Sequence, residues 1–258
     1  MRKIAVGISF IICLMLLSEA VYAQTTQQRG VAKYNIVSKP RIAYLKQKGE
    51  LVFDGNISVF VSNKGAKGVK TQKDDASGQM DLWVEDEFGN VVYKDFAKKE
   101  MYLREIVWQQ PYVSQEPSLP NFDWKIENEQ KSIGKFKCRK ATTEFRGRSF
   151  TVWFTPEIPI ADGPWKFHGL PGLILEAKDA KGDYSFELES IVYPALNINI
   201  EMTKPTDGLK VDFKTFQKAD DLEFEKMSRK AHASSGDRGG ELTVKKNPQN
   251  PIELKYEN

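Results

Sequence analysis

Cys138, Glu157, Asp162 and His168 are the residues of this sequence whose side chains are most suited to catalysis. A reactive cysteine needs exposure and a thiol pKa lowered by a histidine or by clustered cations. Cys138 lies in an alternating segment, two residues after Phe136, and its sequence neighbours on a strand point away from it. We therefore favour a buried, inert thiol, with redox chemistry, intermolecular pairing or nucleophilic catalysis as the less favoured alternatives.

His168 follows a turn-rich stretch and would act as a general base if Asp162 or Glu157 oriented its ring. No Gly-x-Ser-x-Gly nucleophile motif accompanies it, so a turn histidine with a local hydrogen bond is the favoured interpretation. The other histidine, His232, is expected to be solvated on a helix. Glu157, Asp162 and Glu176 also offer carboxylate pairs of the kind that glycosidases use, but their separation does not follow from the sequence.

Metal and cofactor sites are not indicated. The sequence has no His-x-x-x-His pair, no Cys-x-x-Cys pair and no EF-hand loop. The stretch Asp179–Asp183 resembles a hairpin turn more than a weak calcium loop. We therefore expect no metal and no cofactor.

Charge and composition also restrict the partners. The 258 residues contain 38 Lys plus Arg and 35 Asp plus Glu, a formal net charge of +3, with two His and two Cys. A nucleic-acid-binding protein usually carries a larger basic excess on one face, so nucleic acid is not expected as a partner. Basic residues do gather in the segment 135–148, which suggests either a solvated strand face or, less favoured, contact with anionic lipid or an acidic partner. Trp153 and Trp165 are interpreted as core residues rather than as the lining of a concavity.

The N-terminus has the pattern of a secretory signal peptide. Met1–Lys3 is basic, Ile4–Leu17 is apolar, and Val21 and Ala23 suit a cleavage site after residue 23. The apolar run is short for a bilayer span, which needs roughly 20 residues, so no transmembrane span is expected after cleavage. Cleavage also removes Cys13. We expect an exported protein located in the periplasm, at the periphery of the outer membrane, or in the medium.

Period-2 alternation from Val31 to Val192 predicts an antiparallel sheet. We expect a hairpin that joins Leu82–Val84 to Val91–Tyr93, an exposed loop over 62–79, and a proline-rich loop over 110–122. Further strands are predicted as follows: 31–37, 51–53, 57–61, 124–126, a hairpin of 136–142 with 150–155, a central strand at 173–175, and 184–192.

Helical spacing replaces the alternation after Pro205 and predicts one helix over 214–233. The expected fold is mainly β, with a single antiparallel, curved or half-barrel-like sheet and a C-terminal helical appendage. The expected organisation is a signal peptide over 1–23, a β domain over 24–205, and a C-terminal helix and tail over 206–258.

A series of constrained turns precedes the central strand. Pro171 followed by Gly172 suits a type II turn, because proline fixes φ at its first central position and glycine permits positive φ at the second. The motif and structural residues of this region are Gly147, Arg148, Pro159, Gly163, Pro164, Gly169, Leu170, Pro171, Gly172, Leu173 and Ile174.

With these residues in this order, the chain resembles the GLPGLI family of exported bacterial proteins, whose naming string stands at 169–174. The resemblance extends to Phe53-Asp54-Gly55, to Trp124-Lys125-Ile126 and to 250–254. It implies an envelope protein of Bacteroidota-type bacteria and implies no activity.

Three functional hypotheses follow. The first is a non-enzymatic envelope protein whose curved sheet binds a protein partner or a small ligand. The second is an envelope hydrolase with a site near 169–174, and the third is an accessory subunit of an outer-membrane assembly that uses the C-terminal helix.

Overall fold

The computed structural model describes residues 29–39, 45–73, 80–195, 202–235 and 252–253. The predicted signal peptide at 1–23, Cys13 and most of the C-terminal tail lie outside the described residues, as does the side chain of His232.

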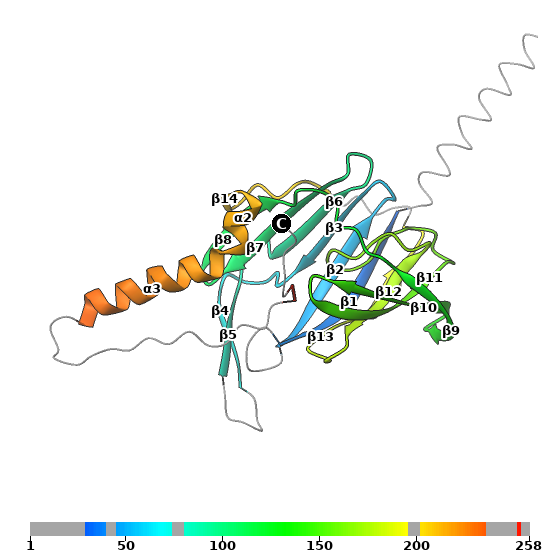
Figure 1. Ribbon diagram of the computed structural model, residues 1–258, viewed down its shortest axis with the longest axis horizontal. Coiled ribbons are helices and arrows are strands. Elements are labelled where there is room, and N and C mark those ends of the chain that lie inside the picture. Colours follow the sequence, from blue (N-terminus) through cyan, green and yellow to red (C-terminus); the bar gives the residue numbers. More distant parts are fainter. Residues whose placement is uncertain (1–28, 40–44, 74–79, 196–201, 236–251, 254–258) are drawn as a thin grey trace, which may run out of the picture.

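The fold is mainly β, as predicted, with one large open sheet and two C-terminal helices (Figure 1). Within the described ranges twelve strands form the main sheet in the order β14-β8-β7-β6-β3-β2-β1-β13-β12-β11-β10-β9. The two end strands do not pair with each other, so the sheet is not closed. The pairs are antiparallel except β14 with β8, which is parallel, so the sheet is mixed. The strands are β1 (Gly30–Ser38), β2 (Leu45–Phe53), β3 (Ile57–Ser62), β4 (Gly68–Lys73), β5 (Met80–Glu85), β6 (Asn90–Asp95), β7 (Glu100–Val107), β8 (Gln110–Gln115), β9 (Lys125–Ile133), β10 (Phe136–Phe145), β11 (Arg148–Thr155), β12 (Leu173–Asp179), β13 (Tyr184–Val192) and β14 (Leu209–Lys210).

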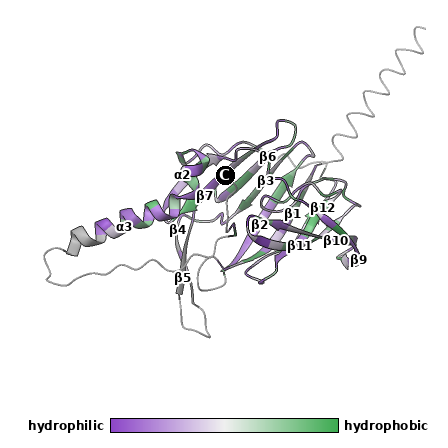
Figure 2. Ribbon diagram, viewed as in Figure 1, coloured by the Kyte–Doolittle hydropathy of each residue, from purple (hydrophilic) through white to green (hydrophobic). Residues whose placement is uncertain are grey.

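One face of the sheet, called the inner face here, carries the hydrophobic core. Alternate residues of neighbouring strands supply it, among them Tyr34, Leu51, Phe60 and Val152. The predicted central strand 173–175 lies in β12, where all three residues are fully buried. Figure 2 shows hydrophobic residues along the strands, whereas the projecting helix is largely hydrophilic.

The segment 156–172, called the motif loop here, packs into this core. Ile158, Ile160, Phe167 and Leu170 are almost completely buried and belong to the same apolar cluster as the strands. The protein itself therefore fills this part of the inner face. A ligand site that uses the curvature of the sheet here would have to displace the motif loop.

Two predictions about the segment from β4 to β6 are wrong. The segment 82–84 does not pair with 91–93, because β5 pairs with β4 in a separate two-stranded sheet, whereas β6 lies between β3 and β7. Strand β4 lies inside the predicted loop 62–79, of which residues 74–79 are outside the described part. Its polar, lysine-rich sequence concealed the strand, and Figure 1 shows that the β4–β5 hairpin extends away from the main sheet.

The predicted loop 110–122 begins with a strand, β8, that contains Pro111. Strand β14 pairs only with Tyr112 and Val113 of β8. On that side of β8, no described strand pairs with Pro111. A proline, which lacks an N–H, is tolerated at such an edge position.

The predicted helix 214–233 is two helices, α2 (Phe213–Gln217) and α3 (Ala219–Ser235). The carboxylate of Asp212 accepts a hydrogen bond from the Thr215 N–H at 2.8 Å and caps the start of α2, whose C-cap is Lys218. Figure 1 shows α3 projecting from the sheet. None of the helices within the described ranges combines the length and the apolar character that a bilayer span requires.

The turn before β12 differs from the predicted type II turn. The Gly172 N–H donates to the Leu170 carbonyl at 2.8 Å, whereas the Leu173 N–H donates to Ile158 at 3.0 Å. The hydrogen bonds therefore define a three-residue turn centred on Pro171, and they join the end of the motif loop to its beginning. The positive φ expected of Gly172 is present, at +150°.

We predict that Gly172→Ala destabilises the protein by about 2–4 kcal/mol, because strain and overpacking coincide at this position. A Cβ atom there would lie 2.2 Å from the Thr155 carbonyl oxygen, at a backbone φ that side chains rarely adopt. The matched control is Gly134→Ala, which also has positive φ but faces open space, and for which we expect a cost of about 1 kcal/mol. Urea unfolding measures both, and equal costs for the two variants would contradict the packing argument.

Candidate functional site

A buried ion pair holds the motif loop against the sheet. Lys94 on β6 and Asp162 in the loop are both fully buried, and the Lys94 ammonium donates a hydrogen bond to the Asp162 carboxylate. The same ammonium donates to the carbonyl oxygens of Gly163 at 2.8 Å and Phe167 at 3.3 Å. An ammonium has three N–H donors, so Lys94 uses all of them on one carboxylate and two backbone carbonyls of the motif loop.

The backbone around this pair leaves little free space. A Cβ on Gly163 would lie 2.8 Å from the Ile174 Cβ, so glycine allows the loop to lie directly against β12. The Tyr34 hydroxyl of β1 donates to the Ile174 carbonyl at 2.8 Å. Burial lowers the pKa of Lys94, and the carboxylate of Asp162 opposes that shift.

The structure does not assemble His168, Asp162 and Glu157 into a catalytic group. His168 and Asp162 are neighbours through a short β-bridge, but the Nδ1 atom of His168 bonds to the Lys166 carbonyl at 2.9 Å, and Asp162 binds Lys94 instead. Glu157 accepts a hydrogen bond from the Lys137 N–H at 2.7 Å. Burial and the charge of Lys94 lower the pKa of His168, which favours the neutral ring.

A second buried cluster includes Lys166 of the motif loop and consists of two cations and two carboxylates. Lys166 forms ion pairs with Glu116 and, at 2.7 Å, with Glu253. Arg146 forms ion pairs with the same two carboxylates, at 3.0 Å to Glu116 and 2.8 Å to Glu253. Burial alone would raise the pKa of Glu116, but hydrogen bonds from Arg146 and the charge of Lys166 outweigh it and lower that pKa.

The basic segment 135–148 is therefore not simply a solvated strand face, which corrects the favoured interpretation. Arg146 belongs to the cluster just described, and Arg148 is buried in an ion pair with Asp179 at 2.8 Å. Asp179 also accepts the Tyr184 N–H at 2.8 Å, so the stretch 179–183 is a hairpin turn held by Arg148. Sequence patterning did not show these pairs, because their members are 30 to 107 residues apart.

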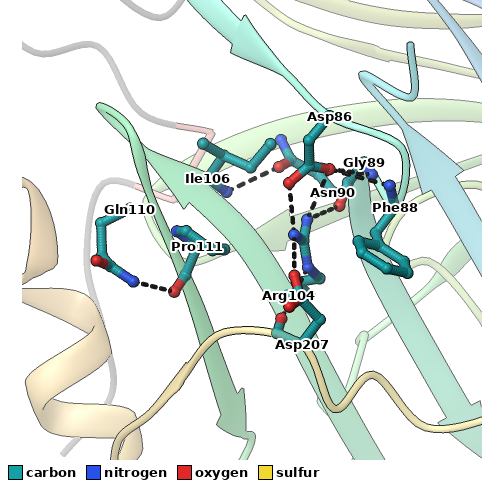
Figure 3. A network of polar contacts seen from close by, with 9 residues as sticks. All are labelled: Asp86, Phe88, Gly89, Asn90, Arg104, Ile106, Gln110, Pro111 and Asp207. Carbon is teal, nitrogen blue, oxygen red and sulfur yellow. Dashed lines mark hydrogen bonds and ion pairs between the residues drawn. The ribbon is translucent and has the colours of Figure 1, made fainter. Parts of the chain in front are cut away.

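A third polar network fastens the β5–β6 connection to the segment that precedes β14 (Figure 3). The Arg104 guanidinium contacts both carboxylate oxygens of Asp86, at 2.5 and 3.2 Å, and the Asp207 carboxylate at 2.7 Å. Burial alone would raise the pKa of Asp86, but hydrogen bonds from Arg104 and from the backbone of Gly89 and Phe88 lower it. The two carboxylates of this network compensate the positive charge of Arg104, whose side chain is only 1% exposed.

The polar side chains that a ligand could reach lie on the opposite face of the sheet, called the outer face here. A pocket of about 320 Å³, called the outer pocket here, is formed by β9, β11, β12 and β13. Residues that face each other across antiparallel strands share a face, and the register places Trp153 opposite Glu176 and Glu176 opposite Glu187. The Lys131 ammonium binds the Glu176 carboxylate and lies 4.6 Å from the centre of the Trp153 ring. Trp153 therefore lines a pocket while also packing against the core, which corrects its interpretation as a core residue alone.

Cys138 lies near this region but is not accessible. The side chain is fully buried, and its Sγ donates to the Phe136 carbonyl at 3.7 Å. Burial raises the pKa of the thiol to about 11, with smaller contributions from Glu176 and Glu157, so the thiol stays protonated at neutral pH. Among the side chains that the structure describes, no group of three or more His, Cys, Asp or Glu is placed to hold a metal ion.

Comparison with known proteins gives a fold and one family match. A family model described as "Protein of unknown function (Porph_ging)" matches residues 145–176, the part of the chain that contains β11, the motif loop and the start of β12. No curated protein matches the chain.

Solved structures of PNGF-II are similar in fold. The structure in space group P21 has a TM-score of 0.52 and 14% identity, and that in space group C2 has a TM-score of 0.50 and 11% identity. Both matches cover 74% of this chain and 32% of the PNGF-II chain, so this chain spans about a third of that protein. At these identities the likeness concerns the fold alone.

We predict that Lys94→Met destabilises the protein by about 3–5 kcal/mol, because it leaves the Asp162 carboxylate buried without its cation. In the double variant with Asp162→Asn, the cost should be smaller than the sum of the single costs by more than about 1 kcal/mol. The control is Lys48→Met, which removes an exposed ion pair with Glu189 and should cost less than about 1 kcal/mol. Urea unfolding of the wild type, the two single variants, the double variant and the control tests this. Additive costs of the two single changes would contradict a direct coupling.

We also predict a pH dependence from His168. Its pKa in the folded protein lies below the ordinary value of 6.5, so the unfolded chain binds the proton first as the pH falls. The His168 contribution to the free energy of unfolding therefore declines below about pH 6.5 and is fully lost below the folded pKa. In His168→Asn, unfolding midpoints compared at pH 7.5 and 5.5 should fall less than in the wild type. An equal fall in both proteins would contradict the prediction.

Proposed function

We propose that this protein is an exported, non-enzymatic binding protein of the bacterial cell envelope, related to the GLPGLI proteins, and that it binds through the outer pocket. The observation that carries this proposal is the contrast between the two faces of the sheet. On the inner face, the charged side chains are already paired: Lys94 binds Asp162 of the motif loop, and Lys166 of the same loop binds Glu116. On the outer face, an aromatic ring and several charged side chains border an open pocket.

Export is supported by the basic start, the apolar run and the cleavage pattern of residues 1–23. Membership of the GLPGLI family is supported by the string at 169–174 and by the match of a family of unknown function over 145–176. Both point to an envelope protein of Bacteroidota-type bacteria.

A binding role is favoured over hydrolysis by the state of the candidate catalytic groups. Asp162 is engaged by Lys94, His168 is not oriented by a carboxylate, and the Cys138 thiol is buried and protonated. Nucleophilic or acid–base catalysis needs an activated group within reach of a substrate. Trp153 and Glu176 border the outer pocket, whereas Asp162 and Cys138 are fully buried.

We predict that, in a deletion strain of the source bacterium with a scorable phenotype, Trp153→Ala fails to restore function. His168→Asn and Glu157→Gln should restore it, because neither side chain lines the outer pocket. Immunoblots of envelope fractions must show comparable abundance of each variant, and the wild type should begin at Gln24 by mass spectrometry.

Two results would contradict the proposal. Restoration by Trp153→Ala together with failure of His168→Asn or Glu157→Gln would favour the hydrolase. A wild-type protein found only in the cytosol with residues 1–23 intact would contradict export.

A further inference from the structure

We infer that the outer pocket binds a neutral, polyhydroxylated ligand with the dimensions of one or two sugar rings. This inference names a ligand class and rests on the proposed function, which concerns binding at this pocket. It is carried by the size of the pocket, the balance of its charges and the position of one aromatic ring.

The size of the pocket limits the ligand. Small-molecule sites have volumes of about 300–1,000 Å³, and the outer pocket, at about 320 Å³, is at the lower end of that range. It lies on the surface of the sheet and is bordered by side chains from β9, β11, β12 and β13. A compact ligand fits such a site better than an extended polymer segment does.

Cations are disfavoured because the pocket already contains one. The Lys131 ammonium lies 4.6 Å from the centre of the Trp153 ring and is held by the Glu176 carboxylate. These are the two contacts that a ligand ammonium would seek. A cationic ligand would have to displace Lys131 from the same contacts, so it would gain little.

Anions are disfavoured by the two glutamates of the pocket. Glu176 and Glu187 stand directly opposite each other on β12 and β13. Like charges in opposed positions destabilise a sheet, and an anionic ligand would add a third negative charge. Lys178 borders the same pocket, so its two lysines balance these two glutamates, and Asp179, which also borders the pocket, is neutralised by its ion pair with the buried Arg148.

Hydroxyl groups match what remains. Within the described residues Glu187 forms no ion pair, so its carboxylate oxygens are free to accept hydrogen bonds from a ligand. Lys178 and the Thr151 hydroxyl supply donors beside it. The half-buried Trp153 ring offers an apolar surface on which the C–H face of a sugar ring can pack. A neutral ligand with many hydroxyls uses all three features without displacing Lys131.

The test titrates the mature full-length protein with three probes that share a six-membered sugar ring and differ in charge. These are N-acetylglucosamine (neutral), glucosamine (cationic) and glucuronate (anionic), with maltotriose and the N-acetylglucosamine trimer as larger neutral probes. Saturation-transfer NMR and tryptophan fluorescence measure binding. We expect at least one neutral probe to bind, and both charged probes to bind at least about fivefold more weakly than that neutral probe.

Variants locate the site. Trp153→Ala should weaken binding of the neutral probe about tenfold or more, and Glu187→Gln about threefold. Glu187→Gln changes one exposed side chain without altering its shape, so it decides the question even if Trp153→Ala fails to fold. The matched control is Glu189→Gln, two residues further along β13 and outside the pocket, which should bind like the wild type.

Three results would overturn this inference: no binding of any neutral probe, tighter binding of a charged probe, or neutral binding that neither pocket variant affects. Failure here remains distinguishable from failure of the proposed function. If Trp153→Ala abolishes complementation while no neutral probe binds, the ligand class is wrong and the binding role stands. If Trp153→Ala restores function like the wild type, the binding role itself is wrong.

Discussion

The fold depends on one buried ammonium group. Lys94 donates to the Asp162 carboxylate and to two carbonyl oxygens of the motif loop, in a region with no exposed surface at either charged residue. Burying an ammonium is costly unless its donors are satisfied, so the loop conformation that supplies these acceptors is stabilised over alternatives that do not. The run of Gly and Pro in 159–172 sets the backbone turns that present these carbonyls to Lys94.

The other charged clusters extend this arrangement. Lys166 lies between Gly163 and Phe167, whose carbonyl oxygens Lys94 holds, and it pairs with Glu116 and Glu253, which also bind Arg146. Phe213 of α2 lies 5.4 Å from the Arg146 guanidinium and 5.7 Å from the Lys166 ammonium, so the first C-terminal helix contacts the same cluster. Segments distant in the sequence are thus joined through ion pairs as well as through apolar packing.

Local patterns in the sequence predicted the elements whose signals are local. The 136–155 hairpin, the buried strand at 173–175 and the alternating strand at 184–192 all appear, because alternation and turn residues decide them. Strand β4 was missed because its residues are polar, and β8 was missed because Pro111 suggested a loop. The break at Lys218 was missed because helical periodicity alone does not show where a second helix begins.

The candidate site was the least predictable part for a different reason. Lys94, Glu116 and Lys131 acquire their significance only from partners far along the chain, as Lys131 does from Glu176, 45 residues away. A charged residue in an alternating strand has the same local signal whether it is solvated, buried in an ion pair or beside a pocket. Only the register of the sheet separates these cases.

The register also connects the motif with the pocket. Along β11, Phe150, Val152 and Phe154 are buried in the core that the motif loop completes, whereas Thr151 and Trp153 border the outer pocket. Because side chains alternate between faces, the interactions that fix β11 and β12 on the inner face also fix the positions of Trp153 and Glu176 on the outer face. Residues that specify the fold can thus position a binding surface that they do not touch. This accounts for a motif rich in Gly and Pro, and poor in catalytic groups, lying beside the candidate site.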